Sequence, residues 1–145
     1  MDRIAQCQCG SLRVTTSGDP ERINICHCQA CQRRTGSVFH CGAVFAKAQV
    51  QPEGESKVYT RIAESGNTVR FHFCPECGSS VYWEPSRYPD HRIVAVGTFA
   101  DPTFPAPFMS VWEETMHAWV RLPAEVRHFP QGLTVSGFRT GDVSR

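Results

Sequence analysis

The chain has 145 residues, 41% of them hydrophobic, and a formal net charge of +1. This length is enough to bury one core and short for two ordinary domains, so we expect a single domain over residues 1–145. The near-neutral charge offers no basic surface to nucleic acid or to an anionic membrane. No apolar run approaches the roughly 18 residues of a membrane span, and residues 1–6 lack the apolar run of a signal peptide. We therefore expect a soluble, cytoplasmic protein.

Short runs rich in β-branched and aromatic residues follow one another along the chain, separated by turn residues. Apolar and other residues alternate most clearly over residues 39–45 and 69–73, which predicts two half-buried strands. The pattern as a whole predicts an all-β domain of short antiparallel strands. The expected strands span residues 12–16, 22–25, 38–45, 58–62, 69–73, 81–83 and 93–96.

One segment has a helical pattern. Residues 29–35 predict a short helix that follows a cysteine cluster and ends at Gly36, a residue suited to a left-handed cap. Further along, three prolines between residues 97 and 107 remove backbone donors and predict an ordered loop. Weak alternation at Leu133, Val135 and Phe138 favours a final edge strand.

The eight cysteines fall into three clusters and one isolated position. They are Cys7 and Cys9; Cys26, Cys28 and Cys31; Cys41; and Cys74 and Cys77. In a reducing compartment, such spacings favour metal ligation or redox work over structural disulfides. A redox Cys-x-x-Cys motif belongs at the start of a helix in a βαβ unit, whereas residues 74–77 lie between two expected strands. Zinc ligation is therefore the favoured interpretation.

The two outer pairs share a feature that the central cluster lacks. Cys7-x-Cys9 and Cys74-x-x-Cys77 are each followed by glycine, which can adopt a positive φ and let backbone N–H groups approach the sulfurs. We predict that these four cysteines form one tetrahedral zinc site with Zn–S bonds of about 2.3 Å. Because four thiolates leave no room for a substrate, this zinc is expected to be structural and to join distant parts of the chain.

Cys26, Cys28 and Cys31 supply three thiolates from one segment, with no obvious fourth ligand beside them. The cluster therefore predicts a second zinc with an open, catalytic-type coordination position. His27 lies between two ligands and is expected to point away from the metal. His40 faces the side of its strand that can reach the pocket, but a satisfied or exposed histidine is the favoured interpretation.

Cys41 could also complete the central set of ligands. It alternates with Phe39, Ala43 and Phe45, and buried cysteine often behaves as a small hydrophobe. We therefore expect Cys41 to belong to the core.

The three cysteine motifs, in this order and at this spacing, resemble the glutathione-dependent formaldehyde-activating enzyme family, which centromere protein V-like proteins share. The motifs are Cys7-x-Cys9-Gly10, Cys26-His27-Cys28-x-x-Cys31-Gln32-Arg33-Arg34-Thr35-Gly36-Ser37 and Phe73-Cys74-Pro75-x-Cys77-Gly78-Ser79. Residues 96–101 and Trp119 also resemble family positions, although Ala118 stands where a proline often precedes the tryptophan. The resemblance implies a tent-like all-β fold, a structural zinc on the outer cysteines and a catalytic-type zinc on the central three.

The resemblance also implies a carbon–sulfur lyase, similar to S-hydroxymethylglutathione synthase, with glutathione as co-substrate and formaldehyde as the aldehyde. Zinc held by three thiolates is a poor Lewis acid, and its natural ligand is a thiol, which binds as the thiolate beside an incoming carbonyl compound. Arg33 and Arg34 follow the ligands directly and are candidates for pairing with a glutathione carboxylate. The expected partners are a small-molecule thiol and an aldehyde, with no nucleic acid and no membrane.

A non-catalytic alternative remains open, in which zinc only staples the fold and residues 99–119 form a protein-binding surface. The segment is rich in aromatic residues, which more often fill a core than line an interface. They are Phe99, Phe104, Phe108, Trp112 and Trp119. Whether the central zinc has three protein ligands or four discriminates between the two functions.

Overall fold

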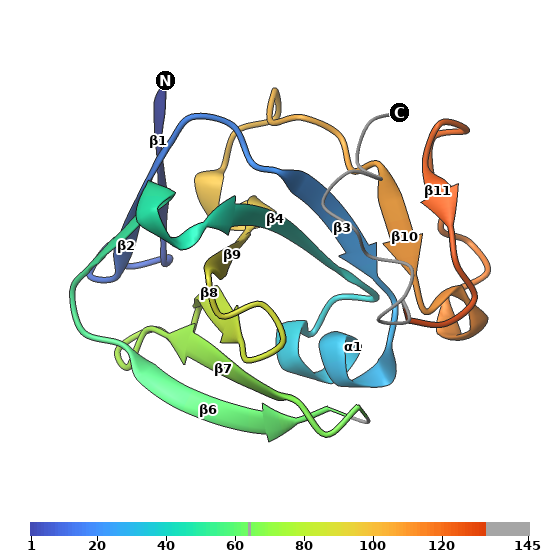
Figure 1. Cartoon of the computed structure of the whole chain (residues 1–145), viewed down its shortest axis with the longest axis horizontal. Helices are drawn as coiled ribbons and strands as arrows, with labels where there is room; N and C mark the ends of the chain where they lie inside the picture. Colours follow the sequence, from blue (N-terminus) through green and yellow to red (C-terminus); the bar gives the residue numbers. More distant parts are fainter. Residues whose placement is uncertain (64, 133–145) are drawn as a thin grey trace. The chain divides into compact units, whose positions relative to one another are not determined.

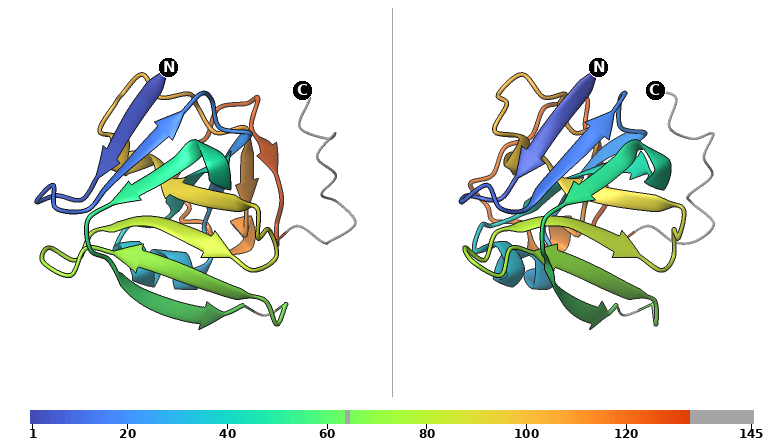
Figure 2. Two further views of the ribbon diagram at one scale, coloured as in Figure 1. Left: turned by 60° about the vertical axis from the view of Figure 1, so that its left-hand side comes forward. Right: turned by 90° about the vertical axis from the view of Figure 1, so that its left-hand side faces the viewer.

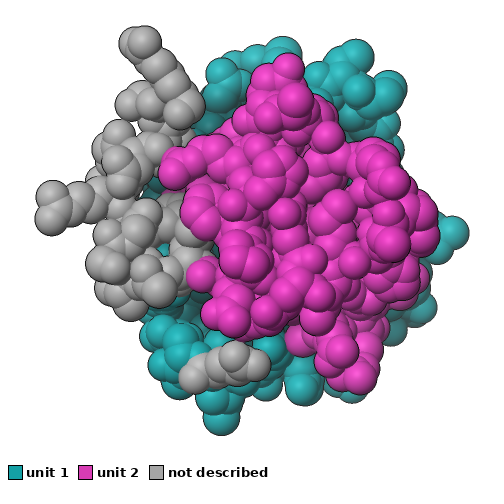
Figure 3. Space-filling model, turned by 90° about the vertical axis from the view of Figure 1, so that its right-hand side faces the viewer, with its two compact units in different colours: residues 1–21, 42–104 teal, residues 22–41, 105–145 magenta. Residues whose placement is uncertain are grey.

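The computed structural model describes residues 1–63 and 65–132 (Figure 1). Most of its regular structure is β-strand, which confirms the all-β prediction. Backbone contacts divide the chain into two compact units, coloured separately in Figure 3. The first unit comprises residues 1–21 and 42–104, and the second comprises residues 22–41 and 105–145. The single domain over residues 1–145 stays a prediction. No helix in the described ranges is long and apolar enough to cross a membrane.

The smaller sheet of the first unit contains β1 (Asp2–Gln6), β2 (Arg13–Ser17) and β5 (Val50–Glu53), paired antiparallel with β2 in the centre. Only β2 was expected. In β1, Ala5 is the one fully buried side chain, so the strand carries little apolar alternation. In β5, Pro52 weakens the strand signal but is tolerated at the edge of a sheet.

The larger sheet of the first unit is antiparallel and made of strands that the alternation predicted, within a few residues. In spatial order these strands are β4 (His40–Ala46), β9 (His91–Ala95), β8 (Ser80–Pro85), β7 (Thr68–Phe73) and β6 (Lys57–Ile62). Figure 2 shows β6, β7 and β8 running side by side. The first two residues of β4, His40 and Cys41, belong to the second unit.

The expectation that two of these strands are half-buried was wrong. Gly42, Ala43, Val44 and Phe45 of β4 are all buried, so both faces of this strand are covered. In β7, Phe71 and His72 point to opposite faces and both are buried. Polar partners make the burial of a histidine possible, and alternation cannot reveal them.

The second unit contains β3 (Arg22–Cys26), α1 (Gln29–Thr35), β10 (Met109–Val111) and β11 (Arg127–His128). β10 pairs with both β3 and β11 in parallel, which corrects the expectation of antiparallel strands throughout. The physical reason is connectivity, because parallel neighbours need long connections and the chain returns to β3 only after most of the first unit. β10 and β11 have three and two residues, too few for a sequence pattern.

The helix α1 has the predicted bounds and the predicted left-handed cap. Gly36 has φ 70° and donates its N–H to the carbonyl of Gln32 at 2.9 Å. At the other end, Cys28 is the N-cap and its sulfur accepts the Cys31 N–H at 3.3 Å. The helix terminus and the central cysteine cluster are therefore the same piece of structure.

Three short 3-10 turns complete the described structure: η1 (Lys47–Gln49), η2 (Val96–Phe99) and η3 (Glu113–Thr115). The loop predicted over residues 97–107 contains no strand, as expected, but its first three residues belong to η2. The edge strand expected around Leu133, Val135 and Phe138 lies outside the described residues.

Candidate metal centres

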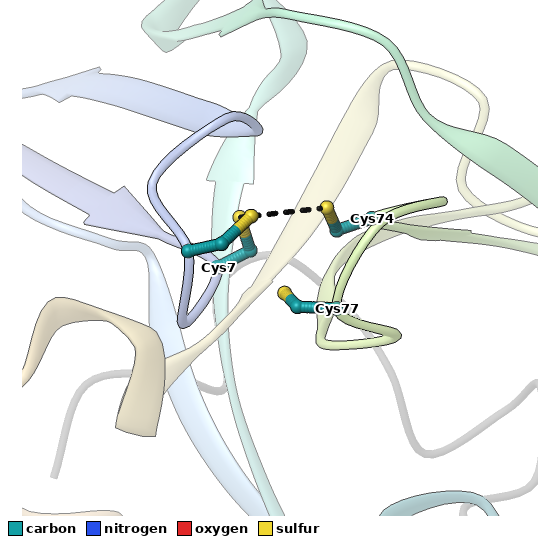
Figure 4. Close-up of side chains that lie close together, drawn as sticks. Cys7, Cys74 and Cys77 are labelled. Atoms are coloured by element: carbon teal, nitrogen blue, oxygen red, sulfur yellow. Dashed lines mark hydrogen bonds between the residues drawn. The ribbon is translucent and has the colours of Figure 1, made fainter.

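The four outer cysteines come together in the first unit. The sulfurs of Cys7, Cys9, Cys74 and Cys77 all lie within 4.8 Å of one another. Figure 4 shows Cys7 on the loop after β1 and Cys74 and Cys77 on the loop after β7, with their sulfurs facing a common centre. The Cys9 sulfur lies 3.6 Å from those of Cys7 and Cys74. Tetrahedral zinc with Zn–S bonds of about 2.3 Å requires S···S separations of about 3.8 Å, so this donor set fits zinc.

Glycines shape both turns of this cluster, as the sequence predicted. Gly10 has φ 81° and Gly78 has φ 77°, both in the left-handed region that favours glycine. Their N–H groups close the turns onto the carbonyls of Cys7, at 3.0 Å, and Cys74, at 2.9 Å. The Leu12 N–H donates to the Cys7 sulfur at 3.2 Å. The turn after β1 thus directs a backbone donor at one of the clustered thiols.

Two serine hydroxyls also contact the outer sulfurs, and sequence reasoning missed both. Ser11 Oγ lies 3.0 Å from the sulfur of Cys9 and 3.2 Å from that of Cys74. Ser79 Oγ lies 3.3 Å from the sulfur of Cys77. The available signal was a repeated pattern, since each serine follows directly the glycine that ends its cysteine pair.

These donors change the acidity of the outer thiols. Hydrogen bonds from the Ser79 hydroxyl and backbone lower the pKa of Cys77 to about 5. Burial raises the pKa of Cys7, but the Leu12 N–H and the neighbouring side chains outweigh it, so that the net shift is downward. The fold therefore stabilises thiolates, the form that binds a metal, at two positions of the outer cluster.

The central cluster lies in the second unit and includes a residue that the sequence did not favour. The sulfurs of Cys26 and Cys31 and a ring nitrogen of His40 lie within 4.8 Å of one another. The Cys28 sulfur is 3.1 Å from that of Cys31. The three predicted cysteines are thus neighbours at the start of α1, and His40 brings a nitrogen donor among them. The ring of His40 therefore reaches the pocket, as its side of the strand allows, and the expectation of a satisfied or exposed histidine stays a prediction.

The surroundings of Cys26, Cys31 and His40 favour the neutral forms of these three side chains. Neighbouring Cys28 and Cys31, together with burial, raise the pKa of Cys26. Contact with Cys26 lowers the pKa of Cys31, but Cys28 and burial outweigh it, so that the pKa is raised to about 11. Burial lowers the pKa of His40 to about 3, so its ring is the neutral imidazole that binds metals. Metal binding at this cluster must therefore release thiol protons.

The two candidate arginines occupy different environments. Arg34 is half-buried, and burial lowers the pKa of its guanidinium, while the adjacent Cys31 sulfur opposes this shift. Its positive charge also lowers the pKa of Cys31. Arg33 is exposed on the surface of α1. The structure thus places Arg34 against the sulfurs and leaves Arg33 facing solvent.

His27 and Cys41 both lie outside the two ligand sets. His27 is 0% exposed, its Nε2 lies 2.9 Å from Ser110 Oγ, and its ring meets Phe39 edge-on. Cys41 is half-buried rather than fully buried, and desolvation raises the pKa of its thiol to about 11. Both therefore support the packing around the cluster.

Gln32 connects the central helix to a later segment, a role that sequence reasoning missed. Its Nε2 donates to the carbonyls of His27, at 2.8 Å, and Thr115, at 3.1 Å. Its Oε1 lies 3.0 Å from His117 Nε2, and this ring meets Trp119 edge-on. Trp119 is 67% exposed, so the expectation that it fills the core was wrong. The contacts that lead from Gln32 of α1 through His117 therefore end at an exposed tryptophan, Trp119.

Fold and sites together define a β protein with two separate cysteine clusters, one formed by two glycine-ended turns and one at the start of a helix. The sequence profile of the glutathione-dependent formaldehyde-activating enzyme family matches residues 2–115. The chain therefore belongs to this family, which confirms the resemblance that the cysteine motifs carry.

Comparison with solved structures adds support for the fold alone. A crystal structure of a Rhodobacter sphaeroides protein, a structural genomics target, has a TM-score of 0.52 and 19% sequence identity to this chain. The match covers 66% of this chain and 85% of that one. No curated protein matches the sequence.

Proposed function

We propose that this protein is a zinc-dependent carbon–sulfur lyase or synthase that handles a thiol–aldehyde adduct such as S-hydroxymethylglutathione. The observation that carries the proposal is the proximity of three sulfurs at the start of α1: that of Cys31 lies within 4.8 Å of that of Cys26 and 3.1 Å from that of Cys28, and the Arg34 cation acts on all three. Family membership supports a reaction of the formaldehyde-activating kind. A cytoplasmic location, expected from the sequence, is part of this proposal.

The two clusters have different roles in this proposal. The outer cysteines hold a structural zinc, since four thiols leave no place for a substrate. The central three hold the second zinc ion of the chain. When bound there, zinc supplies a position at which a soft thiol binds as its thiolate at neutral pH. In the reaction the thiol sulfur bonds to the aldehyde carbon and the thiol proton ends on the carbonyl oxygen, so no oxidant or reductant is needed.

Three residues of α1 stabilise the ligand sulfurs, bind the substrate and fix the segment beside it. Arg34 offsets the negative charge of the ligand sulfurs and keeps them close together. Arg33, exposed one position earlier on α1, is available to a carboxylate of glutathione. Gln32 ties the turn at His27 to Thr115, which fixes the segment that carries the exposed Trp119.

A specific observation also favours the second candidate, a non-catalytic zinc module. His40 provides a fourth protein donor beside the central sulfurs, and a site with four permanent protein ligands is closed. The exposed indole of Trp119 then belongs to a protein-binding surface. The two candidates differ in whether a thiol can enter the central site.

Calorimetry of glutathione binding separates the two functions. A free thiol of pKa about 8.5 is mostly protonated at pH 7, so its ligation as thiolate releases a proton. Titrations in buffers of different ionisation enthalpy are expected to report this proton for glutathione and only weak binding for S-methylglutathione. Cys28→Ser should abolish the proton release, while Cys41→Ser, a cysteine outside both clusters, should retain it. Equal affinity for the two compounds would favour the non-catalytic module.

The reaction itself is accessible to exchange spectroscopy. With ¹³C-formaldehyde and glutathione, the zinc-loaded protein is expected to accelerate the exchange between free aldehyde and adduct above the spontaneous rate. Cys28→Ser should return the exchange to the spontaneous rate, whereas Cys41→Ser should not. An unchanged rate with the native protein would contradict the proposed activity.

A further inference from the structure

His40 is the first residue of β4, and its ring turns toward the cysteines of the second unit. Successive side chains of a strand point to opposite faces, so His40 and Cys41 are directed apart. His40 accordingly lies with Cys26 and Cys31, whereas desolvation alone accounts for the pKa shift of Cys41. The placement of His40 thus agrees with the alternation of side chains along β4.

The separations among these atoms are close to those of one coordination sphere. Tetrahedral zinc with sulfur and imidazole ligands requires S···S separations of about 3.8 Å and S···N separations of about 3.5 Å. The ring nitrogen of His40 and the sulfurs of Cys26 and Cys31 lie within 4.8 Å of one another. A contraction of at most about 1 Å between the sulfurs, and of at most about 1.3 Å between a sulfur and the ring nitrogen, brings them onto a single ion.

Three neighbouring elements supply these donors. Cys26 ends β3, Cys31 lies in the first turn of α1 and His40 begins β4. The left-handed cap at Gly36 ends the helix and turns the chain toward β4. Residues 26–40 thus form one closed loop around the site, so a histidine ligand adds little further chain ordering.

The charges around the ring also fit a metal ligand. Arg34 and, more weakly, Cys28 act electrostatically on His40, whose ring nitrogen lies within 4.8 Å of the sulfurs of Cys26 and Cys31. Three thiolates and one neutral imidazole give a bound zinc ion a formal charge of −1, which Arg34 offsets. Sites with three cysteines and one histidine are an established structural class for zinc.

We propose that His40 is a ligand of the central metal ion in the thiol-free protein, where it completes a four-donor site with Cys26, Cys28 and Cys31. A second step, which rests on the function proposed above, is that an incoming thiol takes the coordination position of His40. The metal then has four protein ligands in the absence of a thiol, and the thiol replaces one of them when it binds.

Cadmium provides a direct test in the full chain, because ¹¹³Cd is a soft probe for sulfur and imidazole donors and couples to ligating ¹⁵N nuclei. In protein labelled with ¹⁵N-histidine and loaded with ¹¹³Cd, we expect coupling to one ring nitrogen of His40. His40→Gln identifies the signal by removing it, and His91→Gln, which alters a histidine bonded to Glu21 in the first unit, should leave it unchanged. Coupling to His27, or to no histidine, would overturn the proposal.

Metal release gives a second readout that does not depend on activity. Loss of a supporting partner of a metal ligand typically weakens a site by about 10–100-fold. For His40→Ala we expect a chelator to remove the central zinc at least about tenfold faster, with the release from the outer cluster unchanged. An unchanged central release rate would contradict ligation by His40.

Glutathione titration separates the proposal from the function on which its second step rests. Loss of the His40 coupling at saturating glutathione, with cadmium still bound, supports both. Persistence of the coupling at saturation overturns entry of the thiol by ligand exchange and leaves ligation by His40 standing. Absence of the coupling from the start, with thiol-linked proton release intact, overturns ligation by His40 and leaves the proposed function standing.

Discussion

Cys77→Ser tests whether the outer cluster holds the first unit together. Cys9 and Cys74, whose sulfurs are 3.6 Å apart, are separated by 65 positions in the chain. A metal that joins them removes loop-closure entropy from the unfolded chain, worth about 4 kcal/mol if it acts as a cross-link does. Cys26 and His40, the ends of the proposed central ligand set, are 14 positions apart, and the same relation gives about 3 kcal/mol.

We therefore expect Cys77→Ser to destabilise the protein by about 1 kcal/mol more than Cys28→Ser, once each variant has lost its metal. For a chain of this size, the difference corresponds to about 2–4 °C in Tm. Serine preserves most of the volume of cysteine, so packing losses are small in both variants. The comparison isolates the span of chain that each metal site closes.

The assay is thermal unfolding followed by circular dichroism, with zinc content measured on the same samples. Cys41→Ser is the matched control, because this half-buried thiol lies outside both clusters and its loss should not change the zinc content. Equal losses of Tm for Cys77→Ser and Cys28→Ser would refute the division into a structural and a chemical site.

Three further predictions concern metal content, backbone and pH. Fully loaded protein should contain two zinc ions per chain, which a chelator releases in two phases, and a single phase would contradict two unlike sites. Gly54→Ala should destabilise the protein by about 2–4 kcal/mol in urea unfolding, because Gly54 has φ 93° and its new Cβ would overlap the Ser11 carbonyl. Gly66→Ala, with φ 83° and open space, should lose only about 1–2 kcal/mol, and similar losses would exclude the overlap. Burial raises the pKa of Glu84, but hydrogen bonds, first that from His72, outweigh it and place the folded pKa below the unfolded value of about 4.3. The stabilising contribution of Glu84 is therefore present above the pKa of the unfolded state and is lost as the pH falls through the pKa of the folded state. In urea unfolding, Glu84→Gln should therefore lose less stability on acidification than the native chain.

Sequence reasoning located the elements whose signals are local. Residues 29–35 and their Gly36 cap were predictable because helix ends carry position-specific residues. The longer strands were predictable because several consecutive residues alternate. β1 was not predicted because it has a single fully buried side chain, and β5 was not predicted because it contains a proline. β10 and β11 were not predicted because strands of three and two residues are too short to show an alternation of buried and exposed residues.

The sequence motifs predicted the cysteines of the outer cluster but not the serines that contact them. The spacing of the cysteines and the glycines that follow them indicated which two pairs share one centre, because those glycines shape both turns. Ser11 and Ser79 were missed because a serine after a turn glycine has an ordinary conformational role. Only their contacts with the sulfurs distinguish them.

What the sequence determined by itself about this protein is its family, its β class and the grouping of its cysteines, since each depends on residues close together in the chain or on spaced motifs. The tertiary structure decided which side chains from other elements reach those cysteines. His40 and Arg34 lie at the central sulfurs, whereas Arg33 and Trp119 face solvent. The physical reason is that local periodicity predicts that a strand forms, but the direction from which it returns to a site depends on the packing of all the elements around it.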